Sequence, residues 1–196
     1  MRGFSLIDVL VLVVVLGVAA GTMTTLFTRL GAQSADAMRE RQALALAQSL
    51  LDEVLMMPMT YCDPQDARAA TATRALVAID GCESTVEALG PEPGETRYSA
   101  ASRFDNVSDY QGLALPGPGC PGGICDINGT LLNGPGSTLA GCSAAVAMAP
   151  QAMPGIAALD ANGRPQGLRV QVRLRCPGRA DTLVEGVRLR HAPNAG

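Results

Sequence analysis

The cysteines are the side chains best suited to covalent chemistry in this chain, and there are six of them in 196 residues. They lie at Cys62, Cys82, Cys120, Cys125, Cys142 and Cys176. No pair has the Cys-x-x-Cys spacing of a zinc or redox motif, and the single histidine is His191. An even number of cysteines, all beyond an apolar N-terminal run, is typical of a disulfide framework in an exported domain. We expect three disulfides, and the count alone leaves their pairing open.

Two pairings follow from the sequence neighbourhood. Cys120 and Cys125 enclose four residues of a Gly/Pro-rich stretch, and a bond between them would close a small ring. The stretch around them, Gly112–Gly141, is predicted to be a long irregular loop. A Cys62–Cys82 bond would tie the intervening segment to the end of an N-terminal helix. Within it, Ala67–Ile79 is rich in Ala and Thr and is predicted to form a short helix, with an ordered loop as the alternative.

The third pairing follows from a predicted antiparallel sheet. The clearest alternation of apolar and polar residues is in Gly167–Cys176, which is typical of a strand with one buried face. Further strands are expected over Leu139–Ala149 and Thr182–His191. If the first two strands pair antiparallel, Cys142 lies beside Cys176 and both side chains face the core. We therefore predict a Cys142–Cys176 bond.

The two faces of this sheet are expected to differ in charge. In the last strand Leu183, Val187 and Leu189 share one phase, although Glu185 falls in the same phase. The outer face is expected to carry Arg169, Arg173, Arg175, Arg188 and Arg190. The simplest interpretation is a solvated face, and the alternative is a docking surface for a neighbouring subunit or for DNA.

Three oxygen-bearing side chains lie in the segment Phe104–Tyr110, namely Asp105, Asn106 and Asp109. They could supply ligands to calcium, but their spacing is not that of an EF-hand loop. Asp and Asn side chains also stabilise turns by accepting hydrogen bonds from nearby backbone N–H groups. We expect turn chemistry here, with calcium as the alternative, and no other metal site or cofactor.

An apolar run occupies the N-terminus from Phe4 to Phe27 and is interrupted by one acid, Asp8. As a helix it is ~36 Å long at ~1.5 Å per residue, which covers the ~30 Å hydrocarbon core of a bilayer. A removable signal sequence and a plain membrane anchor are two interpretations of this run. Neither explains Asp8, because a carboxylate at the centre of a bilayer costs roughly 2.5–3.5 kcal/mol.

The helix is predicted to continue through Gly31–Met57 and to end before Pro58. Apolar residues in this part recur at alternating spacings of four and three. They form a stripe that should pack on a domain, with Glu53 beside the polar face. The stripe comprises Ala43, Ala47, Leu50, Val54 and Met57.

The residues Gly3-Phe4-Ser5-Leu6-Ile7-Asp8 resemble the cleavage and methylation motif of type IV prepilins, with Asp8 in place of the usual Glu and Ser5 in place of Thr. The resemblance implies that a prepilin peptidase cuts after Gly3 and methylates Phe4, and that Asp8 assists assembly. Two further stretches, Arg41–Val54 and Phe104–Tyr110, resemble minor pilins of the mannose-sensitive haemagglutinin (MSHA) pilus system.

The fold expected on this basis is α+β and pilin-like. One long N-terminal helix would pack on a small antiparallel sheet, with disulfides and long Gly/Pro-rich loops. Four parts are expected: a leader peptide (1–3), a transmembrane or filament-core half of the helix (4–30), an amphipathic half (31–57), and a globular periplasmic or extracellular head (58–196).

The resemblance implies a structural subunit of a type IV pilus, with a role in initiation or at the tip. Its partners would be the prepilin peptidase, other pilin subunits through the N-terminal helix, the inner-membrane assembly platform and membrane lipid. It would cross the inner membrane once, with its N-terminus cytoplasmic, before entering a pilus at the cell surface. The alternatives are a type II secretion minor pseudopilin and a membrane-anchored periplasmic binding module that does not polymerise.

Composition argues against two other function classes. The net charge of −3 and the 3% of aromatic residues disfavour nucleic-acid binding, which needs basic and stacking surfaces. The sequence contains no phosphate-binding loop and no Ser-His-Asp candidate beyond the single His191, so we do not expect an enzyme.

Overall fold

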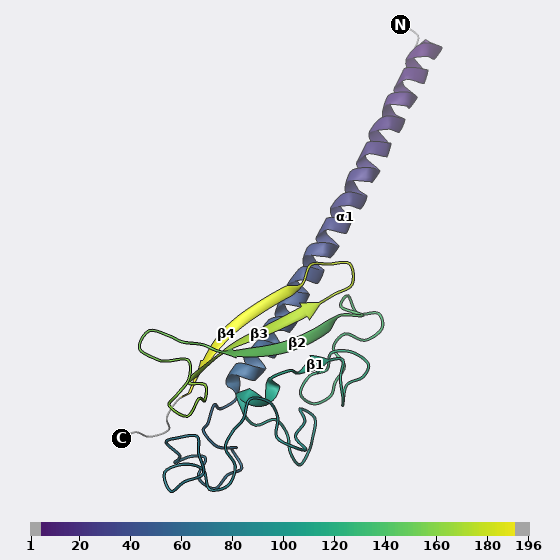
Figure 1. Cartoon of the computed structure of the whole chain (residues 1–196). Coiled ribbons are helices and arrows are strands. Elements are labelled where there is room, and N and C mark those ends of the chain that lie inside the picture. Colours follow the sequence, from purple (N-terminus) through teal and green to yellow (C-terminus); the bar gives the residue numbers. More distant parts are fainter. Residues whose placement is uncertain (1–4, 191–196) are drawn as a thin grey trace. The chain divides into compact units, whose positions relative to one another are not determined.

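The computed structural model describes residues 5–190, without the side chain of Ala32. It contains one long helix, α1 (Leu6–Met56), and a short 3-10 helix, η1 (Val107–Tyr110). Four strands follow: β1 (Ala114–Leu115), β2 (Ser143–Pro150), β3 (Gly167–Arg175) and β4 (Thr182–Leu189) (Figure 1). The chain divides inside α1 into two compact units, one up to Arg41 and one from Gln42 onward, which are described in turn.

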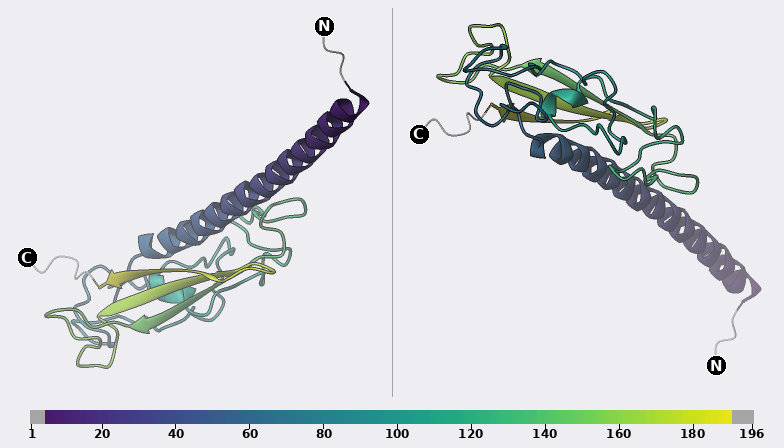
Figure 2. Two further views of the ribbon diagram at one scale, coloured as in Figure 1. Left: turned by 90° about the horizontal axis from the view of Figure 1, so that it is seen from above. Right: turned by 90° about the horizontal axis from the view of Figure 1, so that it is seen from below.

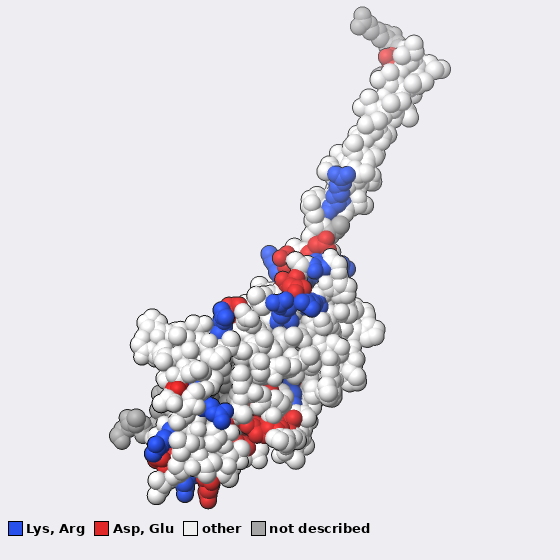
Figure 3. All heavy atoms as spheres, viewed as in Figure 1, with Lys and Arg blue, Asp and Glu red and all other residues white. Residues whose placement is uncertain are grey.

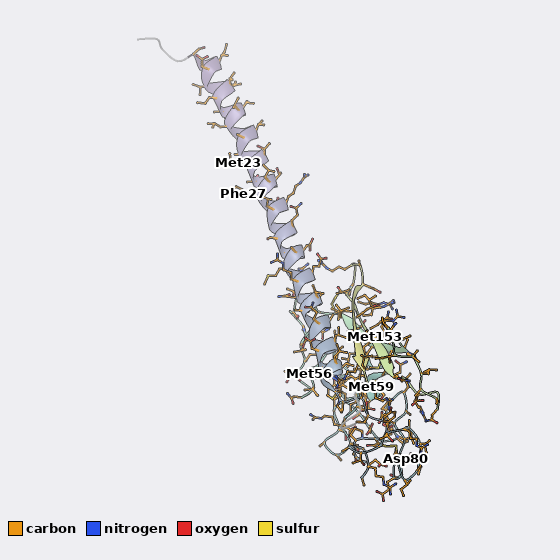
Figure 4. All side chains as sticks on the ribbon, turned by 90° about the vertical axis from the view of Figure 1, so that its left-hand side faces the viewer. Met23, Phe27, Met56, Met59, Asp80 and Met153 are labelled. Atoms are coloured by element: carbon orange, nitrogen blue, oxygen red, sulfur yellow. A yellow bond between two sulfur atoms is a disulfide. The ribbon has the colours of Figure 1, made fainter. Side chains whose placement is uncertain are left out.

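The first unit is helical throughout its described residues from Leu6 to Arg41. Its large apolar side chains are exposed. Met23 and Phe27, for example, are 61% and 73% exposed (Figure 4). An amphipathic helix packed on the core of a water-soluble protein would instead bury its large apolar side chains.

The second unit is built on the last turns of α1 and the sheet, and Figure 2 shows this part of the helix along one sheet face. Ala47, Leu50 and Val54 are buried against the core, as the predicted stripe requires. The helix ends before Pro58, whose ring cannot continue it. Met56 is 83% exposed, whereas Met59 just after the helix is buried (Figure 4).

The sheet is antiparallel with the strand order β1-β2-β3-β4. In β2 and β3 the buried residues alternate with exposed ones, and Val146 lies opposite Val172 on the core face. The pairing of Ser143 with Arg175 places Cys142 next to Cys176 at the end of the ladder. The predicted strands are therefore present with the expected register, while β1 adds two paired residues to a segment predicted to be irregular.

The phase predicted for the last strand is wrong. Val184 and Gly186 lie opposite the core residues Val172 and Val170, whereas Leu183 and Val187 are 47% and 44% exposed. Close packing against α1 explains why a glycine lies on the core face of β4. A Cβ at Gly186 would lie only 2.6 Å from Leu55 Cδ1. A glycine on the core face thus lets the helix approach, and the larger apolar residues are left outside.

The outer sheet face is also less basic than expected. Arg169, Arg173 and Arg175 are exposed on it, in line with a solvated face. Arg188 instead shares the core phase, opposite Leu168. Arg190 follows β4 and donates hydrogen bonds from Nη1 to the Thr60 carbonyl (2.6 Å) and from Nε to the Pro165 carbonyl (3.1 Å).

Three disulfides are present, Cys62–Cys82, Cys120–Cys125 and Cys142–Cys176, and they are the pairs that the sequence analysis proposes. No described cysteine is free. The segment inside the first bond differs from its prediction. Ala67–Ile79 forms turns and bends and no helix, which corresponds to the alternative of an ordered loop.

The carboxylate of Asp66 explains these turns. It accepts hydrogen bonds from the backbone N–H groups of Arg68, Glu83, Ser84 and Thr85 at 2.8–3.0 Å. The bond from Thr85 and those from Arg68 and Ser84 lower the pKa of Asp66 well below its usual range, against the opposing effect of burial. One carboxylate thus folds the chain back on itself at the point where a helix would have had to start.

Candidate functional site

The N-terminal part of α1 is the most unusual surface among the described residues. Its large apolar side chains between Leu6 and Leu30 are 49–81% exposed. A stretch of 18 residues in this helix has a mean hydropathy of 2.5. No Asp, Glu, Lys or Arg lies between Val9 and Thr28. Most of this stretch is accordingly drawn in white in Figure 3, in contrast to the charged side chains of the second unit. It is long and apolar enough to cross a membrane.

The polar side chains of this stretch are satisfied within the helix. Thr22, Thr24, Thr25 and Thr28 each donate a hydrogen bond to a backbone carbonyl three or four residues earlier, at 2.8–3.1 Å. In hydrocarbon such hydroxyls have no water to bond, so internal partners remove most of the cost of burying them. The helix can therefore lie in lipid or among other apolar helices.

Asp8 caps the start of α1. Its Oδ2 accepts a hydrogen bond from the Ser5 backbone N–H (3.1 Å), and the Ser5 hydroxyl accepts one from the Ile7 N–H (3.4 Å). These bonds satisfy two backbone N–H groups at the start of the helix, and an acid in the first turn also complements the helix dipole. Asp8 thus has a local role that sequence reasoning missed. Gly3 and Phe4, the proposed processing residues, lie outside the described residues.

A buried ion pair joins the end of α1 to the loops of the second unit. Arg97 donates from Nε and Nη2 to the two Glu53 carboxylate oxygens at 2.7 and 2.6 Å. It also donates to the Tyr98 hydroxyl (2.6 Å) and the Cys125 carbonyl (2.8 Å). Tyr110 Oη donates to Glu53 Oε1 (2.9 Å). Since the Arg97 side chain is only 3% exposed, the charge has no water to replace these partners.

The three residues proposed as calcium candidates have different surroundings. Asn106 is the N-cap of η1, and Asp109 Oδ2 accepts hydrogen bonds from the Asn106 N–H (2.7 Å) and the Asp105 N–H (2.9 Å). Asp105 Oδ2 accepts one from Gln65 Nε2 (3.4 Å). The expected turn chemistry is therefore present at Asn106 and Asp109. Asp109, however, also belongs to a second group of carboxylates.

That second group consists of Glu87, Glu92 and Asp109, which we call the acidic cluster. One oxygen from each side chain lies within 4.8 Å of the other two. Glu87 and Asp109 are buried, at 5% and 1% exposed. Glu87 Oε2, Glu92 Oε1 and Asp109 Oδ1 are buried and have no hydrogen-bond partner among the described residues. Hard carboxylate oxygens in this arrangement are the ligands that calcium or magnesium takes.

Burial raises the pKa values of two carboxyl groups in the acidic cluster. Desolvation raises the pKa of Glu87 to about 9, against a hydrogen bond from Ser108 and with the help of the charges on Asp109 and Glu92. It raises the pKa of Asp109 to about 6, although the N–H groups of Asn106 and Asp105 favour the charged form. The charge on Glu92 therefore disfavours the charged forms of both Glu87 and Asp109.

Arg190 does not neutralise the charge of the acidic cluster through a direct ion pair. Arg190 acts on Glu87 through space, but its guanidinium donates to the Thr60 and Pro165 carbonyls and lies 4.3 Å from the centre of the Tyr61 ring. Burial lowers the pKa of Arg190.

Sequence reasoning missed the acidic cluster and the Glu53–Arg97 pair. The periodicity of the sequence puts Glu53 beside the polar face of the helix. Nothing in that pattern indicates that its partner is an arginine 44 residues later. Glu87 and Glu92 lie in loops without periodicity, so no pattern indicates which carboxylates meet. The available signal was the density of acids around the Gly/Pro-rich stretch 90–94, between Glu87 and Glu95.

Comparison of the chain with protein-family models, with curated proteins and with solved structures gives no match.

Proposed function

We propose that this chain is a minor pilin of a type IV pilus of the MSHA type. A prepilin peptidase removes Met1–Gly3 and methylates Phe4. The apolar half of the helix holds the subunit in the inner membrane, with its N-terminus in the cytoplasm. An assembly platform then transfers the subunit into a filament, in which this half packs among the helices of other pilin subunits.

The observation that carries the proposal is the exposed apolar stretch of α1. A membrane anchor needs only a span of about 20 apolar residues. Here the helix continues without a break to Met56, and its last turns form part of the core of the second unit. A subunit that moves from lipid into a filament needs an exposed apolar helix of this kind, with its hydroxyls satisfied internally.

The disulfides and the sheet support the same function. A head outside the cytoplasm can keep disulfides, and three of them compensate for a core with few aromatic residues. The acid near the helix start supplies the charge that a plain anchor does not need. In a filament Asp8 pairs with the methylated amine at Phe4, its own or that of a neighbouring subunit.

Two substitutions of Asp8 separate its charge from its cap. Asp8→Asn retains an oxygen that can accept the Ser5 N–H bond, whereas Asp8→Ala removes both the charge and the cap. We expect both variants to be cleaved normally and both to be lost from sheared filaments. The reason is that an unpaired amine in a dry core costs about 3–5 kcal/mol. The measurement is an immunoblot of the filament and membrane fractions.

The control is Asp36→Asn, which removes an exposed acid from the same helix and should assemble like the wild type. If Asp8→Asn assembles normally and only Asp8→Ala fails, Asp8 acts as a cap and its proposed pairing is wrong. If both variants reach filaments as the wild type does, Asp8 has no role in assembly.

A further inference from the structure

We infer that Glu87, Glu92 and Asp109 form a calcium-binding site in the second unit, which goes beyond the proposed role as a filament subunit. The three residues come from two segments. Glu87 and Glu92 lie in the loop after the Cys62–Cys82 disulfide, and Asp109 lies in η1. Their facing oxygens are within 4.8 Å of one another. Since calcium–oxygen distances are about 2.3–2.6 Å, two ligands of one ion can be up to about 5 Å apart.

Unpaired oxygens are a second feature of these three side chains. Each of the three carboxylates has one buried oxygen without a hydrogen bond among the described residues, and these are three of the five such side-chain atoms found there. Buried polar atoms are normally paired, and an unpaired one costs about 1–3 kcal/mol, more if it is charged. Three such atoms on three side chains that approach within 4.8 Å of one another indicate a ligand that accepts electron pairs from all three.

Hydrogen bonds to the remaining oxygens of Glu87 and Asp109 hold these two carboxylates in place. Ser108 Oγ donates to Glu87 Oε1 (2.5 Å), and Asp109 Oδ2 accepts the two N–H bonds of the η1 cap. Second hydrogen bonds of this kind fix the orientation of ligating carboxylates in metal sites. The backbone is also fixed, because Gly90 N–H donates to the Ser108 carbonyl at 3.0 Å.

Glu87 and Asp109 each line a cavity, and the two cavities are different. Glu87 lines a cavity of about 330 Å³ beside Met59 and Leu168, and Asp109 lines a second of about 360 Å³ beside Phe104. A doubly charged cation would displace the proton that Glu87 holds at neutral pH and offset most of the charge of the three carboxylates. Calcium fits better than magnesium, because it tolerates irregular sites of protein oxygens, whereas magnesium demands octahedral geometry and keeps its water.

Binding would join segments that otherwise meet through few bonds. The loop that carries Glu87 and Glu92 would be fixed to η1, which contacts the segment after α1 through a bond from Val107 N–H to the Pro58 carbonyl (2.9 Å). Calcium would thereby rigidify the end of the second unit that contains the Cys62–Cys82 disulfide.

The test is calcium binding to the full chain, purified in detergent and stripped with EDTA. Isothermal titration with CaCl₂ at neutral pH should show one site with a Kd of about 10⁻⁶–10⁻³ M. Saturating calcium should raise the Tm by several degrees, since a ligand that binds only the folded state stabilises it. We expect Glu87→Gln and Glu92→Gln each to weaken binding at least about tenfold.

Two controls complete the design. Glu92 is only partly buried, so Glu92→Gln should fold even if Glu87→Gln does not. Asp126→Asn removes a partly exposed acid whose turn bonds an Asn can accept, and it should bind calcium like the wild type. The inference is overturned if the wild type gives no binding, if Glu92→Gln binds as tightly as the wild type, or if Asp126→Asn loses affinity equally. Equal affinity for MgCl₂ would overturn the assignment to calcium.

Discussion

Replacing Arg97 by methionine is expected to lower the free energy of unfolding by about 3–5 kcal/mol, because the substitution leaves the Glu53 carboxylate without its bidentate partner inside the protein. Methionine keeps most of the aliphatic volume of the arginine, so the loss reports the charge rather than a cavity. Arg97 also fixes the Cys125 carbonyl, and the ring closed by Cys120 should therefore loosen. Urea unfolding of the full chain in detergent, followed by circular dichroism, measures the change.

The exposed pair between Arg173 and Asp181 is the matched control, with side chains 49% and 38% exposed. Arg173→Met should cost no more than about 1 kcal/mol, because solvent screens exposed ion pairs. The double variant Glu53→Leu/Arg97→Met should recover part of the lost stability, since removing both charges removes the unpaired one. An effect of Arg97→Met no larger than that of Arg173→Met would show that the buried pair does not anchor α1 to the loops.

Removing the Cys142–Cys176 disulfide is expected to have the second largest effect on stability. The bond closes a loop with a sequence separation of 34 residues at the end of the β2–β3 ladder. In the chain-entropy model such a crosslink is worth about 4 kcal/mol, because it restricts the unfolded chain. We expect Cys142→Ala/Cys176→Ala to lower the free energy of unfolding by about that amount in the same urea measurement.

The matched control is Cys120→Ala/Cys125→Ala, which opens a ring with a sequence separation of 5. The same model gives about 2 kcal/mol for it, so the two double variants should differ by about 2 kcal/mol. Peptide mapping under non-reducing conditions establishes the wild-type pairing first. A larger loss from the small ring would contradict the view that the disulfides act mainly on the unfolded chain.

Regular elements were predictable because their periodicity is local. The stripe through Ala47, Leu50 and Val54 repeats over several turns, and Gly167–Cys176 alternates without interruption. Once the β2–β3 register follows from these patterns, the position of Cys142 beside Cys176 follows too. Only the three-dimensional packing shows that Gly186 faces Leu55, which is why the phase of β4 was wrong.

The loops were not predictable, because single side chains decide their structure. Asp66 gathers N–H groups from two segments and replaces the helix expected over Ala67–Ile79. Likewise, the capping box of η1 follows from the spacing of Asn106 and Asp109, but the approach of Glu87 and Glu92 does not. Contacts between distant loop residues leave no periodic signal in one sequence.

The measurement that tests the proposed function most directly is the intact mass of the chain recovered from sheared filaments and from the inner membrane. We expect a mature chain that begins at Phe4, lacks Met1–Gly3 and carries one added methyl group, and we expect it in the filament fraction. A chain that retains Met1 and occurs only in the membrane would contradict processing and assembly. That result would favour a membrane-anchored binding module.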